Sequence, residues 1–335
     1  MSTKLLEIEN LSVHFHTPEG VARAVDGVSF HLATGETIGL VGESGCGKSV
    51  TSLSVLGLIP SPPGQIASGR IRFAGQNLLE LESEQLRKIR GHQIAMIFQE
   101  PMTSLNPVLP IGRQVSEPLM IHQGLSKTAA LEKAADWLDH VKIPAARKRL
   151  NDYPHQLSGG MRQRVMIAMA MVCGPKLLIA DEPTTALDVT IQAQILSLMI
   201  RLKQELQMSV LLITHDLGVI AQMASRVVVM YAGQVVEEAR VAEIFDRPFH
   251  PYTRGLLKSM PRLRNRLDGS KQRLNEIPGI VPSLTETIAG CKFADRCPHC
   301  FAVCRERQPQ LVAVGDNHQA RCWLKEYPER RKSDA

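Results

Sequence analysis

The chain has 335 residues, of which 44% are hydrophobic and 21% charged, enough to bury the core of one large globular domain with a smaller addition. Its apolar runs are shorter than the roughly 20 residues of a membrane-spanning helix, and its acidic N-terminal segment does not fit a signal peptide. The net charge of +6 suits a surface near a membrane, whereas an aromatic content of 4% argues against a nucleic-acid stacking platform. We therefore expect a cytoplasmic protein that binds no nucleic acid.

The first part of the chain predicts strands that lead into a glycine-rich loop. Residues 5–15 alternate apolar and polar side chains, which predicts an antiparallel strand with one solvated face, and residues 25–32 predict a second strand. Residues 37–41 predict a short buried strand that runs directly into the loop. A helix is expected from Lys48 and should end before Pro60.

The middle of the chain predicts a helical insertion in an α/β domain. Between about residues 100 and 172, apolar side chains recur with a helical period and no strand is expected. Strands are then predicted at residues 176–180, 209–214 and 226–230, with a helix over residues 190–207. Strands that alternate with helices predict a mainly parallel sheet, with ligands at the carboxyl ends of its strands.

The glycine-rich loop matches the phosphate-binding pattern G-x-x-x-x-G-K-[ST] at every specified position. Glycines let backbone N–H groups close around a phosphate, and the following helix directs the positive end of its dipole at the same anion. We expect Lys48 to reach the β- and γ-phosphates of a nucleotide and Ser49 to bind Mg²⁺. The predicted loop consists of Gly42, Glu43, Ser44, Gly45, Cys46, Gly47, Lys48 and Ser49.

Two acidic residues follow the buried strand that ends at Ala180. Asp181 is predicted to help hold Mg²⁺, and Glu182 is predicted to act as the general base toward an attacking water. An acidic pair at the end of a strand can also be a plain structural feature. The phosphate-binding loop in the same chain favours the catalytic interpretation.

A second phosphate-binding surface is predicted far along the chain from the first. Ser158 suits the N-cap of an apolar helix, and Gly159 and Gly160 would expose backbone donors at that helix N-terminus. One chain rarely needs two grips on the γ-phosphate of one nucleotide. We therefore expect this surface to complete the nucleotide site of a partner chain.

Over roughly residues 5–260 these motifs, in this order, resemble those of the ABC ATPase family. The segment Leu157 to Gln163 resembles the ABC signature, with Met161 where many members carry Gln. The other matching positions are Gln99 in the Q-loop, Ala186-Leu187-Asp188 in the D-loop, His215 as the switch histidine, and Phe15 at the place of the adenine-stacking aromatic, where Tyr is commoner.

The resemblance implies an α/β fold of the P-loop NTPase class, with a mixed sheet, an antiparallel β subdomain and a helical insertion. It also implies a head-to-tail dimer in which two ATP molecules lie between the phosphate loop of one chain and the signature of the other. The implied catalytic residues are Lys48, Gln99, Glu182 and His215; Mg²⁺ would lie beside Ser49, Gln99 and Asp181; and Val50, Ser158, Gly159, Gly160 and Asp188 would add nucleotide contacts.

Two further segments narrow the resemblance to the ATPase subunits of oligopeptide, dipeptide and nickel importers. These are residues 98–107, with Glu100 in place of the more usual Asp, and residues 250–257. The resemblance implies a heterodimer with a paralogous ATPase subunit, held peripherally at the cytoplasmic face beneath two membrane permeases and supplied by an external peptide-binding protein. Peptide is favoured over nickel or another small solute as the cargo. A soluble ABC ATPase of translation or DNA repair and a purely regulatory ATP-binding module are less favoured, because the chain has one ATPase unit and keeps Glu182 and His215.

Five of the seven cysteines lie between residues 291 and 322, which in a cytosolic protein indicates metal rather than disulfides. The resemblance implies a [4Fe–4S] cluster held by Cys291, Cys297, Cys304 and Cys322. Cys300 is additional, and the pair Cys297 and Cys300 also suits a zinc hairpin, so zinc and unligated thiols stay alternatives. We predict an ATPase domain over residues 1–261, with its helical subdomain at about residues 100–172, and a small Cys-rich extension over residues 262–335.

Overall fold

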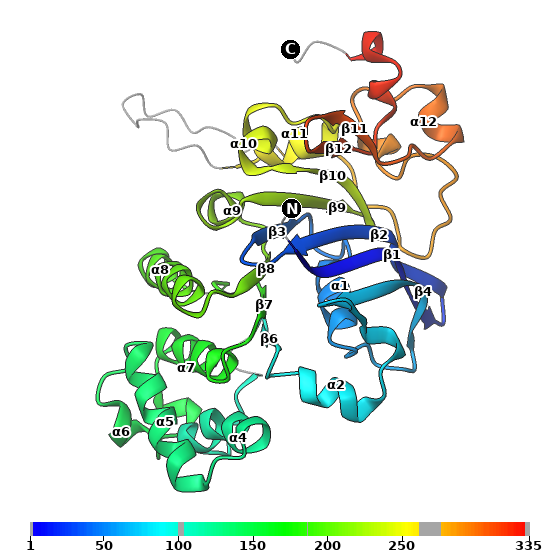
Figure 1. Cartoon of the computed structure of the whole chain (residues 1–335). Coiled ribbons are helices and arrows are strands. Elements are labelled where there is room, and N and C mark those ends of the chain that lie inside the picture. Colours follow the sequence, from blue (N-terminus) through cyan, green and yellow to red (C-terminus); the bar gives the residue numbers. More distant parts are fainter. Residues whose placement is uncertain (1–2, 100–103, 186, 261–275, 332–335) are drawn as a thin grey trace, which may run out of the picture.

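The computed structural model describes residues 3–99, 104–185, 187–260 and 276–331 (Figure 1). Residues 100–103 of the Q-loop region, Ala186 of the D-loop and the predicted domain boundary at 261/262 lie outside the described residues. The described strands form one eight-stranded and one four-stranded sheet, with helices packed around them.

The eight-stranded sheet is mixed and has a parallel centre. Its strand order is β11-β12-β10-β9-β3-β8-β7-β6, and neighbouring strands from β9 to β6 are parallel. The parallel strands are β3 (Thr37–Val41), β6 (Ile94–Ile97), β7 (Leu177–Asp181), β8 (Ser209–Ile213) and β9 (Arg226–Tyr231). The central parallel strands are mainly apolar because both faces of the sheet are covered. In β7, for example, Leu177 and Ile179 join one core cluster, whereas Leu178 and Ala180 join the other.

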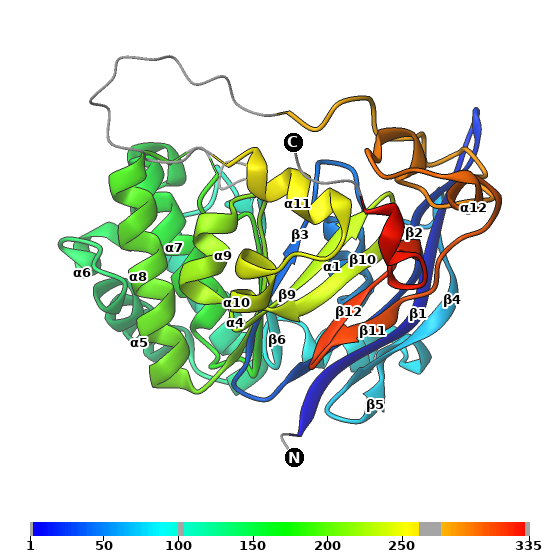
Figure 2. The ribbon, with the colours of Figure 1, turned by 90° about the horizontal axis from the view of Figure 1, so that it is seen from above.

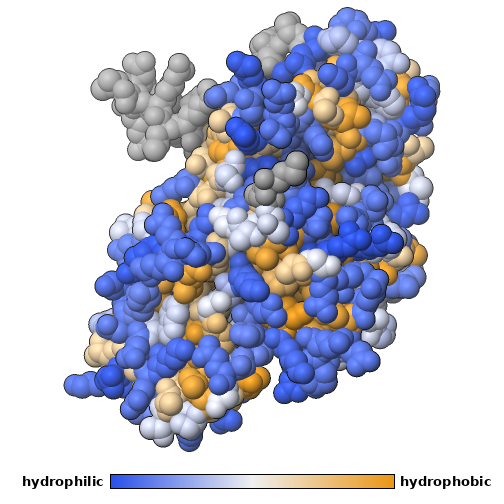
Figure 3. Space-filling view, viewed as in Figure 1, coloured by the Kyte–Doolittle hydropathy of each residue, from blue (hydrophilic) through white to orange (hydrophobic). Residues whose placement is uncertain are grey.

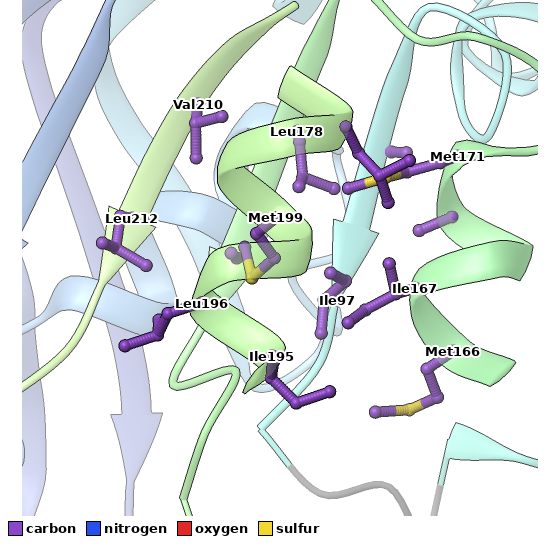
Figure 4. Close-up of a cluster of buried hydrophobic side chains, with 14 of the residues drawn as sticks. Ile97, Met166, Ile167, Met171, Leu178, Ile195, Leu196, Met199, Val210 and Leu212 are labelled. Carbon is purple, nitrogen blue, oxygen red and sulfur yellow. The ribbon is translucent and has the colours of Figure 1, made fainter. Parts of the chain in front are cut away.

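Helices cover one face of this sheet. Figure 4 shows Ile167 and Met171 of α7 (Gly159–Met171) and Met199 of α8 (Val189–Leu206) gathered around Leu178 of β7. The helices α4 (Ile111–Gln123) and α5 (Lys127–His140) pack against α7, and α6 (Ala146–Arg149) packs against α5. The described part of residues 100–172 contains no strand. The described residues of this stretch are thus helical where the sequence shows a helical period, and its delimitation as a subdomain stays a prediction.

The other face is covered by α1 (Lys48–Val55) and by an antiparallel sheet of order β2-β1-β4-β5. Its strands are β1 (Lys4–Thr17), β2 (Gly20–Ala33), β4 (Gly64–Phe73) and β5 (Gln76–Asn77). Both β1 and β2 are longer than predicted. Register shifts along their ladder interrupt the apolar and polar alternation, so the sequence pattern shows only part of each strand.

The C-terminal segment is joined to the main sheet, whereas the sequence pattern suggested a separate appendage. Strand β12 (His318–Ala320) pairs with β10 (Gln234–Arg240), and β11 (Val312–Gly315) pairs with β12. Strands of three and four residues carry too little alternation to be recognised in a sequence. The remaining helices are α2 (Ser83–Ile89), α9 (Leu217–Met223), α10 (Val241–Asp246), α11 (Pro251–Lys258) and α12 (Ala302–Glu306).

Strands β11 and β12 extend the main sheet beyond β10 (Figure 2). The face in Figure 3 is mainly hydrophilic, and its hydrophobic residues form small patches. Within the described ranges, none of the helices has the length and apolar character that crossing a bilayer would require.

A buried carboxylate ties the C-terminal strands to α11. Glu237 of β10 is 0% exposed and accepts hydrogen bonds from the backbone N–H groups of Phe249 (2.6 Å) and His250 (2.9 Å). Its Oε1 also lies 2.7 Å from Nε2 of His318. Burial raises the pKa of Glu237, but these hydrogen bonds outweigh burial and hold the pKa below its ordinary value.

Replacing Glu237 with Ala should lower the free energy of unfolding by about 3–5 kcal/mol, because a buried pair then loses one partner. Urea unfolding at neutral pH measures the difference. The folded pKa of Glu237 is depressed, so its contribution is complete above the ordinary value of 4.5 and is lost as the pH falls further. The difference in unfolding free energy between wild type and variant should therefore narrow below pH 4.5.

Glu84→Ala, which removes an exposed pair with Arg87, is the matched control and should change the free energy of unfolding by less than about 1 kcal/mol. Equal losses in the two variants would contradict the assignment.

Candidate active site

The side chains and the loop that were predicted to bind and hydrolyse a nucleotide lie at the carboxyl ends of neighbouring parallel strands. Gln99 follows β6, Asp181 ends β7 and Glu182 follows it, His215 follows β8, and the loop of residues 42–47 follows β3. Because β3, β8, β7 and β6 are parallel neighbours, these ends meet at one edge of the sheet.

The loop of residues 42–49 requires glycine at two positions. Gly42 has φ of 152°, and a Cβ there would collide with the carbonyl oxygen of Met230. Gly47 has φ of 99°, and a Cβ there would collide with the carbonyl oxygen of Ala24. The loop is thus pressed against its neighbours, and its shape depends on residues without side chains.

Lys48 begins α1 and turns its side chain across this loop. Its Nζ donates to the carbonyl oxygens of Gly42 (2.8 Å) and Glu43 (3.0 Å), and it lies 3.6 Å from Sγ of Cys46. Lys48 is buried, so its charge is held at the loop instead of in solvent. Cys46 is also buried, and burial raises the pKa of its thiol, which fits a filler position better than a reactive one.

Asp181 and Ser49 form a small polar centre below the loop. The hydroxyl of Ser49 lies close enough to the buried carboxyl of Asp181 to lower the pKa of that group. Burial raises the pKa of Asp181, and the nearby charge of Glu182 raises it further. In the described part of the chain, Oδ1 of Asp181 is buried without a hydrogen-bond partner. A hydroxyl beside an unpartnered carboxylate oxygen fits the oxygen ligands that Mg²⁺ takes in proteins, so these two residues suit the predicted ion.

Glu182 is held by three side chains. Its Oε2 accepts hydrogen bonds from Nε2 of Gln99 (3.1 Å) and Oγ1 of Thr185 (2.8 Å), and its Oε1 lies 3.2 Å from Nδ1 of His215. Burial raises the pKa of Glu182, but the bonds from Thr185 and His215 outweigh burial and hold the pKa below its ordinary value. The carboxylate is therefore ionised and can accept a proton. Glu182 also has φ of 47°, a strained conformation of the kind that clusters at functional sites.

The structure joins Gln99 and His215 to Glu182 and leaves Phe15 on a different element. Gln99 was predicted to contact Mg²⁺, and its amide nitrogen contacts Glu182. The side chain of His215 is 66% exposed, so its ring lies at the open edge of the site. Phe15 is half-buried on β1 in the antiparallel sheet. Thr185 carries no motif of its own and was missed by sequence reasoning.

The second predicted surface lies on the helical side of the molecule. Ser158 caps α7, accepting a hydrogen bond from the backbone N–H of Met161 at 3.4 Å, and Gly159 and Gly160 begin the helix. Asp188 caps α8 in the same way, accepting from the N–H of Ile191 at 2.9 Å. Figures 1 and 2 both place α7 and α1 in different parts of the molecule, so this surface and the loop of residues 42–49 are separate.

Two residues outside the predicted set contact that loop. The hydroxyl of Tyr252 in α11 accepts a hydrogen bond from the backbone N–H of Glu43 at 2.8 Å. Arg296, in the C-terminal segment, binds both carboxylate oxygens of Glu43 at 2.6 and 3.0 Å. Tyr252 lies in a segment already used for the importer resemblance, although no role was assigned to it there. Arg296 had no recognisable sequence signal.

The four cysteines predicted to hold a cluster line a single pocket. Cys291, Cys297, Cys304 and Cys322 border it together with His250 and several apolar side chains, and Cys300 is not in this lining. Burial raises the pKa of Cys291 to about 11 and the pKa values of Cys297 and Cys322 to about 12. Across the described ranges, no three His, Cys, Asp or Glu side chains are close enough together to hold one metal ion.

Comparisons with known proteins match two parts of the chain to family models. A model described as "ABC transporter" matches residues 25–185, and one described as "Oligopeptide/dipeptide transporter, C-terminal region" matches residues 236–304. A probable peptide ABC transporter ATP-binding protein of Sinorhizobium fredii is 55% identical over 319 residues, 95% of this chain and 94% of that protein. The oligopeptide transport ATP-binding protein OppD of Bacillus subtilis is 51% identical over 96% of this chain and 89% of its own length.

Solved structures agree with this likeness. An ATP-binding cassette solved as a dimer in a post-hydrolysis state with ADP and Pi is 28% identical and has a TM-score of 0.63, covering 70% of this chain and 98% of that chain. The ABC transporter component cbiO1 of Clostridium perfringens is 26% identical, with a TM-score of 0.61 and coverage of 73% and 91%.

Proposed function

Because this chain belongs to the ABC transporter family of ATP-binding subunits, we propose that it binds and hydrolyses ATP to drive peptide import at the cytoplasmic face of a membrane. The observation that carries the ATPase assignment is the meeting of the phosphate-binding loop, Asp181 and Glu182 at one edge of the parallel sheet. A regulatory module without hydrolysis would not need the ionised, triply held carboxylate of Glu182.

The roles of the residues follow from their positions. Backbone N–H groups of residues 42–49 and the ammonium of Lys48 would bind the phosphates of ATP, and Ser49 and Asp181 would hold Mg²⁺, which offsets phosphate charge. Glu182 would accept a proton from the water that attacks the γ-phosphorus, releasing ADP and phosphate. Gln99 and His215 would orient Glu182, and His215 would also contact the γ-phosphate from the open edge.

The exchange Glu182→Gln tests the catalytic assignment directly. The variant should bind ATP as wild type does, but its turnover should fall by roughly 10²- to 10⁴-fold, the usual contribution of a general base. Steady-state ATPase assays and equilibrium binding of ATP with Mg²⁺ measure the two quantities. The control variant Glu84→Gln, which changes an exposed carboxylate on α2, should hydrolyse ATP at the wild-type rate. Undiminished hydrolysis in Glu182→Gln would remove this residue from its role.

The second surface supports a two-chain site. A Cβ at Gly159 would meet nothing within 4 Å in the described structure, so packing within the chain does not explain the glycine there. A phosphate from outside, bound by the exposed N–H groups at the start of α7, would explain it. We assign Ser158, Gly159, Gly160 and Asp188 to the nucleotide site of a paralogous ATPase subunit in a head-to-tail heterodimer, with Phe15 and Val50 contacting the nucleotide bound by this chain.

The cargo and the remaining partners follow from the C-terminal half. Residues 236–304 match the transporter model for oligopeptides and dipeptides, and the relatives described above carry peptide in their names. These observations favour peptide over nickel, and they favour an importer over a soluble ABC ATPase of translation or DNA repair. The partners would then be two integral permeases and an external peptide-binding protein.

Uptake measurements test the cargo. A strain that lacks this chain should lose ATP-dependent uptake of labelled di- or oligopeptides while keeping nickel uptake. Wild-type protein should restore peptide uptake, and Glu182→Gln should fail to do so although it is made in equal amount. Loss of nickel uptake with intact peptide uptake would show that the chain belongs to a nickel importer instead.

We further propose that Cys291, Cys297, Cys304 and Cys322 hold a [4Fe–4S] cluster. Their arrangement around one pocket supports the proposal, since four thiolates satisfy the irons of such a cluster. The cluster, when bound, would supply cross-links between residues 291–304 and Cys322. A single zinc ion requires four sulfurs at about 2.3 Å from one point, so zinc would need these side chains to close in further.

Metal analysis of the full chain purified without oxygen decides between these groups. We expect about four irons with matching acid-labile sulfide per chain. Replacing Cys322 with Ser should lower the iron content, whereas Cys300→Ser, outside the pocket lining, should leave it unchanged. About one zinc without sulfide, or a chain without metal, would overturn the cluster.

A further inference from the structure

The phosphate-binding loop is anchored at one residue by two segments that lie outside the ATP-binding motifs. The backbone N–H of Glu43 donates to the hydroxyl of Tyr252, and its carboxylate is bound at both oxygens by Arg296. Arg296 stands 253 positions further along the chain, next to Cys297. The C-terminal segment thus reaches the loop that is predicted to bind phosphate.

The side chain of Arg296 is buried and held by hydrogen bonds. Its side chain is 5% exposed, and its Nε and Nη2 donate to the carbonyl oxygens of Pro278 (3.0 Å) and Ile277 (3.1 Å). Nη1 also lies 3.4 Å from the hydroxyl of Tyr231. Together with the two bonds to Glu43, these contacts use five donor positions, as many as a guanidinium has.

The residues around Arg296 leave its side chain little room for another conformation. Its guanidinium carbon lies 5.7 Å from the ring centre of Tyr231 and 5.9 Å from that of Phe293. A Cβ at Gly279, where φ is 86°, would come within 3.0 Å of its Cγ. A planar guanidinium held on its edges by hydrogen bonds and by aromatic rings nearby presents a fixed fork to one carboxylate.

Holding Glu43 also holds the loop. Glu43 follows Gly42, the residue pressed against Met230, and its carbonyl oxygen accepts from the ammonium of Lys48. A rotation of Glu43 would turn the peptide groups on both sides of it, and with them the N–H groups that would bind phosphate. The side chain of Glu43 cannot turn while Arg296 binds both of its oxygens.

We propose that Arg296 is a positioning residue for the ATP site, which sets the affinity for ATP by keeping residues 42–49 in the phosphate-binding shape through Glu43. The proposal rests on the proposed function only in taking this loop as the ATP site. It assigns to the C-terminal segment an indirect part in nucleotide binding, separate from any part in cargo or metal.

The test compares Arg296→Lys and Arg296→Met with wild type in the full-length chain. Lysine keeps the charge but cannot bind both carboxylate oxygens, and methionine keeps the apolar stem alone. Both variants should raise the KM for ATP and the Kd for ATP with Mg²⁺ by about tenfold or more, since losing one hydrogen bond to a charged phosphate weakens binding by about that factor. The value of kcat at saturating ATP should stay within about twofold, because Glu182 and its partners are untouched.

The matched control is Arg305→Met. Arg305 belongs to the same C-terminal segment and pairs with Asp295 at 2.7 Å, but its side chain is 64% exposed. Its KM for ATP should equal that of wild type. A role in folding alone would lower the active fraction, and hence the apparent kcat, in proportion to lost protein while leaving KM unchanged.

Glu43→Gln completes a double-mutant cycle and keeps the proposal testable if Arg296→Met folds poorly. If Arg296 acts through Glu43, the double variant should raise KM no more than the larger single effect. Additive increases, or folded single variants with unchanged KM, would overturn the proposal. Absence of ATP hydrolysis in wild type would instead refute the proposed function, so the two failures are distinguishable.

Discussion

The parallel pairing of β3, β8, β7 and β6 decides where chemistry can occur in this molecule. Parallel strands place all their carboxyl ends on one edge, and burial of both faces leaves the loops at that edge as the place where polar groups can reach a ligand. Residues more than 100 positions apart, such as Gln99 and His215, therefore meet at Glu182. The two core clusters keep the sheet rigid, so the separation of these groups is set by strand spacing rather than by the loops themselves.

Within this frame, two neighbouring carboxylates have opposite properties. Asp181 is buried with an unpartnered oxygen, and burial raises its pKa, whereas hydrogen bonds from Thr185 and His215 hold the pKa of Glu182 down. A cation beside Asp181 would stabilise its charged form, while Glu182 is already ionised and can accept a proton. The alternation of β7 and the positive φ of Glu182 separate these two environments, so that adjacent residues can hold an ion and take up a proton.

The sequence predicted the parts of this site that depend on local chemistry and missed those that depend on distant contacts. The loop of residues 42–49 and the acidic pair after β7 can be predicted from the sequence, because glycine, lysine and carboxylate residues are needed there at fixed spacings within one segment. Thr185 and Arg296 were missed because their partners are set by folding, and nothing near them in the chain marks them. The short strands β11 and β12 were missed for a similar reason, since pairing with β10 defines them and their few residues do not.

The contacts that the sequence did not predict pack the C-terminal segment against the rest of the described structure, so it is not a separate appendage. The segment is joined to the sheet by β12, to α11 by the contact of His318 with Glu237, and to the phosphate-binding loop by Arg296. The contact of His318 with Glu237 is buried, and Arg296 is 5% exposed where it meets Glu43. Breaking such a buried pair costs more than breaking an exposed one. Displacement of residues 291–297 would therefore pull on Glu43, and a stable C-terminal segment would keep the loop ready for ATP. Arg296, which precedes Cys297 of the cysteine pocket, would then link order in the C-terminal segment to nucleotide binding through its ion pair with Glu43.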